Sequence, residues 1–279
     1  MNIDLYSDRA KQAIQSAQSL ALARRHQQFT PAHLLKVLLE ETDGMARALI
    51  VSAGGRPDAA DQAVEALLAK TPKVEGGSGQ DSMVFNGAAG GERFDVSANG
   101  SRVRYTRDLG NIVMDVHGVE DIVTNTLGGV DTFTAHDLTG TGVTSLEVNE
   151  GVNGVGDGQP DRVTVNGTDG NDVITVAGSG SSATVTGLAA TVHVTGTDVG
   201  DGVSDGLAVE GNGGDDAIIA TSLQAGVVSY FADGGAGNDV LVGSAGNDSL
   251  SGGDGDDIVV GGPGVDVLDG GAGNNTVIQ

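Results

Sequence analysis

Segment 234–279 repeats a nine-residue pattern in which glycines and an aspartate recur at fixed positions. Its five units begin at residues 234, 243, 252, 261 and 270, and they read GGAGNDVLV, GSAGNDSLS, GGDGDDIVV, GGPGVDVLD and GGAGNNTVI. Calcium takes roughly six to eight oxygen ligands at about 2.3–2.6 Å, and carboxylates and main-chain carbonyls can both supply them. Glycine adopts positive φ angles at low cost, so it can aim carbonyl oxygens into one small space. The pattern therefore predicts calcium binding.

The spacing also predicts how the units stack. Each unit divides into a six-residue turn and a three-residue strand whose central apolar residue points inward; these residues are Leu241, Leu250, Val259, Leu268 and Val277. If two units make one coil, turns on the same side are two units apart in the sequence, and Asp239 lies over Asp257 while Asp248 lies over Asp266. We therefore predict a mainly β fold, a parallel β-solenoid in which neighbouring turns share ions.

This array resembles the RTX, or hemolysin-type, calcium-binding repeats, whose consensus is G-G-x-G-x-D-x-U-x. The resemblance implies a parallel β-roll in which the position-six aspartates supply carboxylates and the turn glycines supply carbonyls. The metal-site residues are then Asp239, Asp248, Asp257, Asp266, Gly235, Gly237, Asn238, Gly246, Asn247, Gly253, Gly255, Asp256, Gly264 and Asn275. Asn275 replaces the last aspartate, so we expect its site with Asp257 to be weaker. The alternative is a glycine-rich solenoid that folds without calcium.

Segment 83–233 contains short stretches of alternating β-branched residues between glycine-rich turns, which predicts strands and excludes helix. An aspartate precedes an apolar residue by two positions at Asp121, Asp131, Asp161, Asp172, Asp205 and Asp216, as in an eroded form of the same repeat. Two stretches match the nonapeptide individually, GTDGNDVIT at 167 and GNGGDDAII at 211, but neither has a partner turn at the two-unit spacing. Asp172 and Asp216 are therefore further candidate ligands.

Residues 1–75 have helical periodicity instead. Apolar residues recur at three- and four-residue spacing from Ala10 to Ala21, and Thr30-Pro31 has the form of a helix N-cap followed by proline. Gly54-Gly55 ends a third apolar stretch and Thr71-Pro72 ends a fourth. The pattern predicts about four short helices around one small core.

The helical segment resembles the N-terminal domain of ClpB-type disaggregases. The similar stretches include Asp8-Arg9-Ala10, the run from His26 to Pro31 and the run from His33 to Leu39, and the likeness continues through Gly76-Gly77. In that family the domain holds two four-helix repeats that recruit substrates or adaptors, and ATPase modules follow. Only one repeat is present here, and the sequence has no G-x-x-x-x-G-K-[ST] phosphate loop, so we expect no unfolding motor.

Charge is distributed unevenly along the chain, whose net charge is −24. Residues 1–107 hold 13 Lys and Arg against 12 acidic residues, whereas residues 108–279 hold Arg162 alone against 26. So acidic a segment repels nucleic acid and anionic membranes and attracts cations. The chain has no cysteine, so disulfides and thiolate metal sites are excluded. We also expect neither a cleaved N-terminal signal nor a membrane span.

Catalytic motifs are absent from the sequence: it contains neither H-E-x-x-H nor G-x-S-x-G, and its five histidines are scattered without a carboxylate and nucleophile at triad spacing. We therefore expect no enzyme. The predicted organisation is a Clp-like helical repeat (1–75), a glycine-rich linker (76–82), degenerate solenoid repeats (83–233) and the regular array (234–279).

The function predicted first is calcium binding coupled to folding, in a secreted bacterial protein that leaves by a type I secretion machinery. The alternative is a cytoplasmic adaptor that docks on a Clp-type partner protein through residues 1–75. A third hypothesis is a fusion in which the helices have no selected function.

Overall fold

The computed structural model describes residues 7–24, 30–41, 44–68, 74–152, 155–200 and 203–279. The chain divides into two compact units. One comprises residues 1–74 with 112–116, and the other comprises residues 75–111 with 117–279. No helix of the described residues is long and apolar enough to cross a membrane.

The first unit contains four helices, as the sequence predicted: α1 (Asp8–Ala23), α2 (Pro31–Glu40), α3 (Met45–Ser52) and α4 (Pro57–Leu68). Thr30 is the N-cap of α2, and the Nδ1 atom of His33 lies 3.0 Å from the Thr30 nitrogen. Leu39, Val64 and Leu68 form the core between α2 and α4. Helix α3 ends where Gly54 adopts a φ of 78°, a conformation that glycine permits. Thr71-Pro72, predicted to end the fourth helix, lies outside the described residues.

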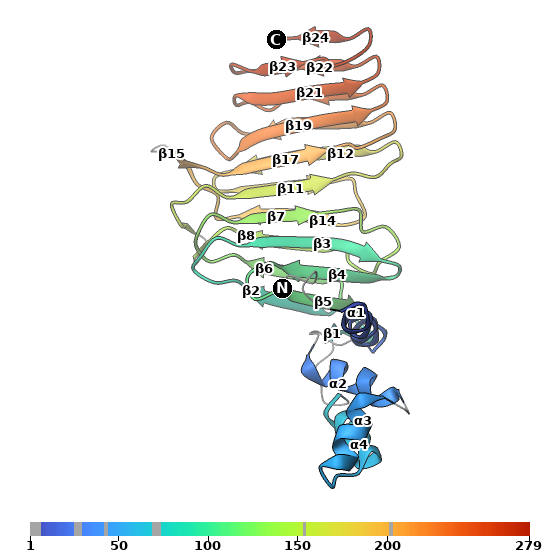
Figure 1. The fold of residues 1–279 in the computed structure, drawn as a ribbon. Coiled ribbons are helices and arrows are strands. Elements are labelled where there is room, and N and C mark those ends of the chain that lie inside the picture. The colour runs from blue at the N-terminus through green and yellow to red at the C-terminus, as the bar shows by residue number, and fades with distance from the viewer. Residues whose placement is uncertain (1–6, 25–29, 42–43, 69–73, 153–154, 201–202) are drawn as a thin grey trace. The chain divides into compact units, whose positions relative to one another are not determined.

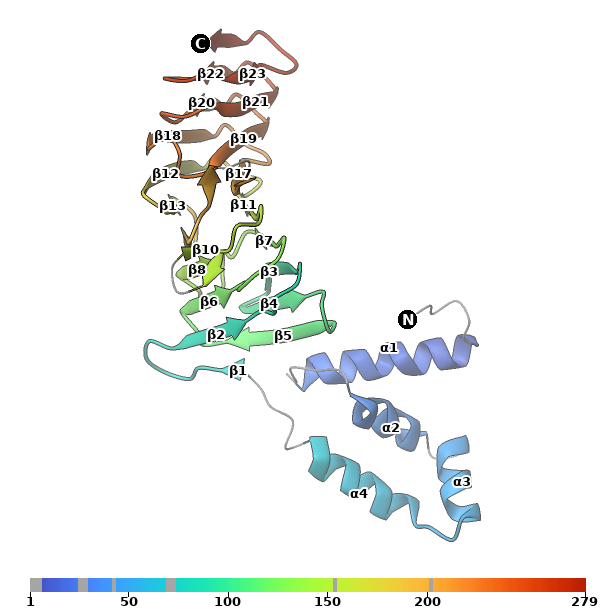
Figure 2. The ribbon, with the colours of Figure 1, turned by 90° about the vertical axis from the view of Figure 1, so that its left-hand side faces the viewer.

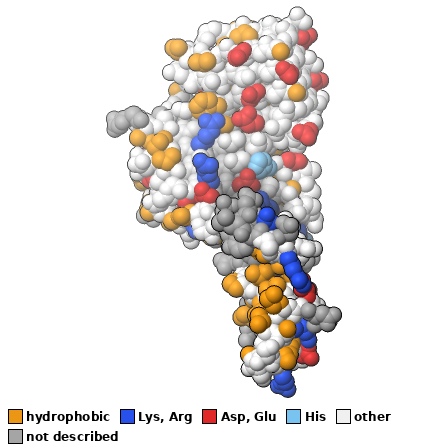
Figure 3. All heavy atoms as spheres, viewed as in Figure 1, with side chains coloured by type: hydrophobic (Ala, Val, Ile, Leu, Met, Phe, Trp, Pro, Cys, Tyr) orange, Lys and Arg blue, Asp and Glu red, His pale blue; other side chains and the backbone are white. Residues whose placement is uncertain are grey.

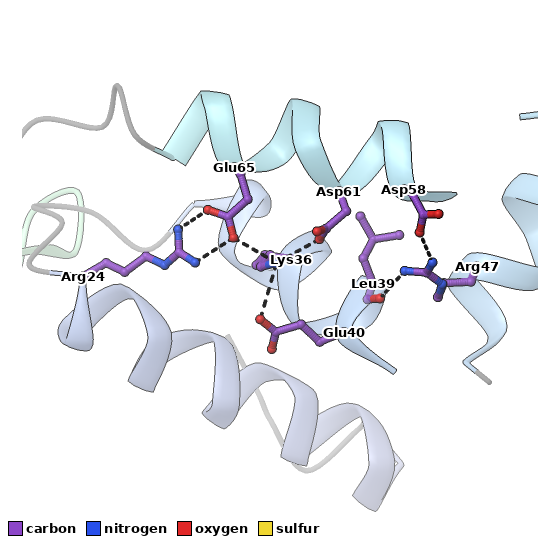
Figure 4. Close-up of polar contacts among 8 residues, drawn as sticks. All are labelled: Arg24, Lys36, Leu39, Glu40, Arg47, Asp58, Asp61 and Glu65. Atoms are coloured by element: carbon purple, nitrogen blue, oxygen red, sulfur yellow. Dashed lines mark hydrogen bonds and ion pairs between the residues drawn. The ribbon is translucent and has the colours of Figure 1, made fainter. Parts of the chain in front are cut away.

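An ion-pair network links α1, α2 and α4 (Figure 4). The Nζ atom of Lys36 lies 2.9 Å from both Asp61 Oδ1 and Glu65 Oε1, and Arg24 lies on the other side of Glu65, with Nη2 2.8 Å from Oε1. The hydrogen bonds from Arg24 and Lys36 lower the pKa of Glu65 to about 2. Hydrogen bonds to Glu65 and Asp61 raise the pKa of Lys36, whose side chain is buried.

The second unit is built from strands that alternate between two sheets. In the order in which its strands lie side by side, one sheet contains β4 (Arg102–Arg107), β3 (Arg93–Asn99), β7 (Thr132–Ala135), β11 (Arg162–Asn166), β17 (Gly206–Glu210), β19 (Ser229–Ala236), β21 (Asp248–Asp254) and β23 (Val267–Asp269). The other contains β2 (Ser82–Asn86), β6 (Asp121–Asn125), β8 (Ser145–Asn149), β14 (Thr191–Thr195), β13 (Ser182–Thr186), β12 (Val173–Ser179), β18 (Ala217–Leu223), β20 (Val240–Val242), β22 (Ile258–Val260) and β24 (Thr276–Ile278).

The other strands of the described residues are β1 (Val74–Glu75), β5 (Ile112–His117), and the hairpin strands β9 (Gly151–Val152), β10 (Val155–Gly156), β15 (Val199–Gly200) and β16 (Val203–Ser204). From β7 onwards each strand of the first sheet is parallel to the next, and the same is true from β12 to β24 through β18, β20 and β22. Figures 1 and 2 show these strands stacked one coil upon another.

The register between coils is two nonapeptide units in the array, where Val240 pairs with Ile258 and Ile258 with Thr276. Towards the N-terminus the coils are longer: Ala217 pairs with Val240, and Val173 with Ala217. The predicted inward positions are buried at Leu241, Leu250 and Val259. Leu268 is only half-buried and Val277 is 46% exposed.

Candidate calcium-binding site

The aspartates that precede successive strands of one sheet form a ladder. Its members are Asp172, Asp216, Asp239, Asp257 and Asn275, which stand just before β12, β18, β20, β22 and β24. In each step the main-chain nitrogen of one member donates to Oδ1 of the next, at 2.7 Å from Asp172 to Asp216, 2.7 Å from Asp216 to Asp239, 2.9 Å from Asp239 to Asp257 and 2.7 Å from Asp257 to Asn275. One oxygen of each acceptor therefore fixes the register between coils.

The second oxygens of three of these aspartates have no protein partner. Asp216, Asp239 and Asp257 are 2%, 1% and 1% exposed, and their Oδ2 atoms are buried without a hydrogen-bond partner among the residues described. A buried carboxylate oxygen without a donor is costly unless a cation or a proton neutralises it. Burial, together with the charges of neighbouring aspartates, raises the pKa of Asp216 to about 6 and raises that of Asp239. The arrangement thus fits a cation.

Main-chain oxygens lie beside these carboxylates. A Cβ atom on Gly234 would clash with Asp239 Oδ2 and would lie 2.5 Å from the carbonyl oxygen of Gly252 in the next coil. A Cβ atom on Gly252 would lie 2.5 Å from Asp257 Oδ2 and 2.6 Å from the oxygen of Gly270. Because Gly234 and Gly252 have no Cβ atom, the carboxylate of their own unit can approach a carbonyl oxygen of the following coil.

Turn geometry does account for the second and fourth glycines. Gly235 and Gly253 have φ angles of 94° and 101°, and Gly237 and Gly255 have φ angles of 140° and 142°. These conformations are accessible to glycine and strained for other residues. The carbonyl oxygens of Gly235 and Gly237 occupy the space that a Cβ atom on Gly253 and Gly255 would need, so successive turns pack main chain against main chain.

The opposite edge of the array is different. Asp248 stacks on Asp266 as expected, with its nitrogen 2.9 Å from Asp266 Oδ1. However, the hydroxyl and the main-chain nitrogen of Ser244 donate to Oδ1 and Oδ2 of Asp248, each at 2.6 Å, and Gln279 Nε2 donates to Asp266 Oδ2 at 2.9 Å. Protein donors therefore already satisfy this predicted pair. Asp172 is similar, because the nitrogen and hydroxyl of Thr168 lie 2.7 and 3.0 Å from its Oδ2.

The remaining predicted residues lie in the turns but have structural contacts. Position-five side chains form an exposed ladder: Asn238 Oδ1 accepts from the Asp256 nitrogen at 2.9 Å, Asp256 Oδ1 accepts from Asn274 at 2.8 Å, and Asn247 Oδ1 accepts from Val265 at 2.9 Å. Gly246 and Gly264 pack on each other, since the Gly246 oxygen occupies the Cβ position of Gly264. Asn275 uses its amide nitrogen to bind the Gly271 oxygen at 3.1 Å.

No three His, Asp or Glu side chains of the described residues form a ready-made metal site. A calcium ion on the edge that carries Asp216, Asp239 and Asp257 would therefore take one or two carboxylates, with main-chain carbonyls such as those of Gly234 and Gly252 completing the shell.

The sequence analysis placed Asp131, Asp161 and Asp205 before strands of an eroded repeat, but it did not predict that they form a second acidic ladder at the start of the other sheet's strands. The Glu92 nitrogen donates to Asp131 Oδ1 at 2.7 Å, Asp131 to Asp161 at 2.8 Å, and Asp161 to Asp205 at 2.8 Å. The signal was available, since Glu92, Asp161 and Asp205 each stand five positions after a glycine, as Asp239 follows Gly234. Because the coils in this segment differ in length, the members of the ladder do not recur at a fixed spacing in the sequence.

A carboxylate also lies beside one histidine, which the sequence had suggested was isolated. His136 Nε2 is 2.8 Å from Asp95 Oδ2, and His136 borders an open groove of about 570 Å³ with Ser97, Asn166 and Thr168. The pair comes from separate coils, so sequence spacing could not show it.

Comparison with known protein families finds a match for each of the two parts of the chain. The family described as "Clp repeat (R) N-terminal domain" matches residues 5–87. The "RTX calcium-binding nonapeptide repeat (4 copies)" matches residues 160–178, 233–268 and 250–277. The chain thus contains a segment similar to the Clp N-terminal repeat and segments similar to RTX nonapeptide repeats. Both resemblances inferred from the sequence are confirmed, and the match at 160–178 includes the unit that contains Asp172.

The curated relatives match the helical part. Over 83 residues the chain is 57% identical to the chaperone protein ClpB of Agrobacterium fabrum, and this stretch covers 30% of this chain and 10% of that protein. It is 52% identical over 80 residues to ClpB of Mesorhizobium japonicum, covering 29% and 9%. The chain thus spans about a tenth of the length of these relatives. No solved structure matches the chain.

Proposed function

We propose that the chain is a calcium-binding RTX-type protein whose nonapeptide coils form a β-roll and fold as calcium binds. The observation that carries the proposal is the set of three buried, unpartnered Oδ2 atoms of Asp216, Asp239 and Asp257 on one edge of the coils. Their burial without a donor disfavours the calcium-free folded state, because charged oxygens packed in successive coils repel one another. Calcium would replace the missing donors, so its binding free energy becomes folding free energy.

Isothermal titration calorimetry of the full chain tests calcium binding directly. Asp239→Asn keeps the Oδ1 hydrogen bond to the Asp216 nitrogen and removes the charge, so we expect fewer or weaker calcium sites. Asp256→Asn is the matched control, because this aspartate is exposed and its Oδ1 contact can be retained by asparagine. Equal titrations for Asp239→Asn and the unchanged chain would reject the assignment.

The proposal includes secretion without enzymatic activity. Extracellular calcium modules fill at about 10⁻⁴ to 10⁻³ M, so the array would stay unfolded in the cytoplasm and fold outside, after export by a type I machinery. Support comes from the RTX match and from the strongly acidic C-terminal half. The test is to express the full chain with and without a type I exporter and to assay the medium. Retention in the cytoplasm in both cases would contradict secretion.

A second candidate function is a cytoplasmic adaptor for a Clp-type partner. It is favoured by the Clp repeat and by apolar side chains that the helices leave in solvent: Met45 is 74% exposed, Leu49 62% and Leu67 58%. Figure 3 shows hydrophobic side chains gathered on the helical unit. Co-purification of the full chain with ClpB, abolished by Leu49→Asp and retained by Asp256→Asn, would support this role.

A further inference from the structure

A second group of buried acidic side chains lies outside the nonapeptide array, where β7, β11 and β17 begin. Asp131, Asp161 and Asp205 immediately precede these strands and are 2%, 3% and 1% exposed. Glu150, which directly follows β8, is 2% exposed. Four carboxyl groups are therefore buried outside the regular array of residues 234–279, and Asp161 among them lies within the RTX match at residues 160–178.

Three of these carboxyl groups have a buried oxygen without a hydrogen-bond partner in the described part of the chain: Asp131 Oδ2, Glu150 Oε2 and Asp161 Oδ2. Asp205 differs, because its Oδ1 accepts from the Asp161 nitrogen at 2.8 Å and its Oδ2 from the Asp198 nitrogen at 2.6 Å. Main-chain donors thus satisfy Asp205. Asp131 stands next to Glu92 in the ladder, accepting from its nitrogen at 2.7 Å, and Arg107 pairs with Glu92 at 3.0 Å, so a basic side chain lies near Asp131. Glu150 and Asp161 lie beyond that ion pair.

The β9–β10 hairpin places Glu150 beside the ladder that contains Asp161. Gly151, the neighbour of Glu150, pairs with Gly156, and a Cβ atom on Gly156 would clash with the Asp198 carboxyl group, whose main-chain nitrogen donates to Asp205 Oδ2 at 2.6 Å. Burial, followed by the charges of Asp205 and Asp161, raises the pKa of Glu150 well above its ordinary value. Burial and the charges of Asp205 and Asp131 raise the pKa of Asp161 to about 8.

Among the described residues no ion pair joins Glu150 or Asp161 to a basic side chain, although Arg162 directly follows Asp161 in the sequence. Arg162 is the single Lys or Arg between residues 108 and 279, and its guanidinium stacks over the Phe231 ring at 4.9 Å. Arg107 pairs instead with Glu92, at 3.0 Å, at the far end of the ladder. Neutralisation of Glu150 and Asp161 must therefore come from protons or from a bound cation.

The turns around the two groups are held by other carboxylates. Asp157 Oδ2 accepts from the Gly129 nitrogen at 2.7 Å, and Asp198 Oδ2 accepts from the Gly158 nitrogen at 2.7 Å. These bonds link turns of successive coils across long sequence separations. The result is a supported acidic site, in which some carboxylates fix the main chain and others are left over for a ligand.

We propose that Glu150 and Asp161 bind a divalent cation of the calcium class, at a site separate from the RTX array. Two carboxylates, with main-chain carbonyls and water for the remaining positions, suit the oxygen preference and the flexible geometry of calcium. The bound ion stabilises the middle coils, which differ in length and therefore lack the regularly stacked turns of the array. It does not depend on calcium binding by the array.

Native mass spectrometry of the full chain tests the site, after the chain is stripped of metal and returned to calcium. The first measurement leaves the site itself unchanged: in the triple variant Asp216→Asn, Asp239→Asn, Asp257→Asn, one calcium ion should remain bound. Adding Glu150→Gln, which keeps the size of the side chain, should remove that ion. Glu147→Gln is the matched control, because Glu147 is an exposed carboxylate on β8 and its loss should remove nothing.

The outcomes separate the two proposals. If the unchanged chain binds calcium and the triple variant binds none, the array-side edge binds calcium and the separate site does not exist. If the triple variant keeps its ion in the presence of Glu150→Gln, the ion lies elsewhere and the proposal is wrong. If Glu150→Gln raises the melting temperature of the metal-free chain and leaves the ion count unchanged, Glu150 is held as a neutral acid, which also overturns the proposal.

Discussion

The hydroxyl of Ser244 donates a 2.6 Å hydrogen bond to Oδ1 of Asp248, within one nonapeptide unit. Ser244 stands at the second position of its unit, where the neighbouring units have Gly235 and Gly253. Asp239 and Asp257, in those glycine-containing units, have unpartnered Oδ2 atoms. Ser244 therefore supplies donors to both oxygens of Asp248, through its hydroxyl and its main-chain nitrogen, where a cation would be needed for the others. Thr168 likewise donates to Asp172 Oδ2 through its nitrogen and its hydroxyl.

Removing this hydroxyl should create a calcium site. Ser244→Gly leaves Asp248 without its hydroxyl donor, so we expect one additional or tighter calcium site in calorimetry. In metal-free buffer the same change should destabilise the coils by about 1–2 kcal/mol, because a buried carboxylate loses a hydrogen bond. Ser244→Ala removes the hydroxyl without adding glycine flexibility and should give the same gain, whereas Ser244→Thr keeps a hydroxyl and is the control. Calcium binding that none of the three variants alters would contradict this role of Ser244.

Neutralising a ladder aspartate should reduce stabilisation by calcium. Calcium at about 100 times its dissociation constant stabilises a folded site by ~2.7 kcal/mol, and Asp257→Asn should remove most of that increment at its own turn. Denaturant unfolding with and without calcium measures it. In metal-free buffer Asp257→Asn should not destabilise the coils, since asparagine retains the Oδ1 acceptor that binds the Asp239 nitrogen and removes a buried charge. A calcium increment equal to that of the unchanged chain would count against the assignment.

A methyl group at the first glycine of a unit should separate two coils. Gly234→Ala would place Cβ against Asp239 Oδ2 and 2.5 Å from the Gly252 oxygen, so a loss of about 1–3 kcal/mol is expected, together with weaker calcium binding. Gly90→Ala is the control, because its Cβ position has no atom within 4 Å. Denaturant unfolding compares the two variants, and equal stability would show that the carboxylate and carbonyl are not held as described.

The stability of the β unit should fall with rising pH when metal is absent. The folded chain raises the pKa of Asp131 and Asp216 to about 6 and that of Asp161 to about 8, from an ordinary value of 3.8. The folded state therefore holds protons that the unfolded state releases, and this contribution is complete below about pH 3.8 and lost as pH rises to 8. Denaturant midpoints between pH 4 and 8 should decrease in metal-stripped buffer. Calcium should reduce the decrease, and a midpoint that rises over this range in metal-stripped buffer would be contrary to the expectation.

The helical unit should respond in the opposite sense. Hydrogen bonds from Arg24 and Lys36 lower the pKa of Glu65 to about 2 from 4.5, so its contribution to stability is present above pH 4.5 and lost as pH falls towards 2. Loss of helical circular dichroism on acidification should be smaller in Glu65→Gln, which starts less stable but has no charge to lose. Glu41→Gln, a change at an exposed partner of Arg9, is the control and should behave like the unchanged chain.

The sequence predicted the helices and the array because each has a regular local period. The four helices have apolar stripes and caps, and the stacking of Asp239 on Asp257 follows from a coil of two nonapeptide units. It could not predict the pairing of Asp172 with Asp216 or of Asp216 with Asp239, because the coils there are longer and the register is set by hydrogen bonds in the folded chain.

The difference between the two edges of the array was also beyond sequence reasoning. Asp239 and Asp248 occupy the same position in nearly identical units, so the sequence analysis predicted both as calcium ligands. Only the folded geometry shows that Ser244 satisfies Asp248, whereas Asp239 keeps a buried oxygen without a donor. Glu150 had no repeat signal at all, since it belongs to an irregular turn after β8.

Far-UV circular dichroism of the full chain during a calcium titration tests the central claim most directly. If the ladder of Asp216, Asp239 and Asp257 folds around calcium, the β signal should rise cooperatively with calcium, and the rise should be smaller and need more calcium in Asp239→Asn. A spectrum that is already β-rich without metal, and that calcium changes in neither protein, would mean that the coils fold by packing alone.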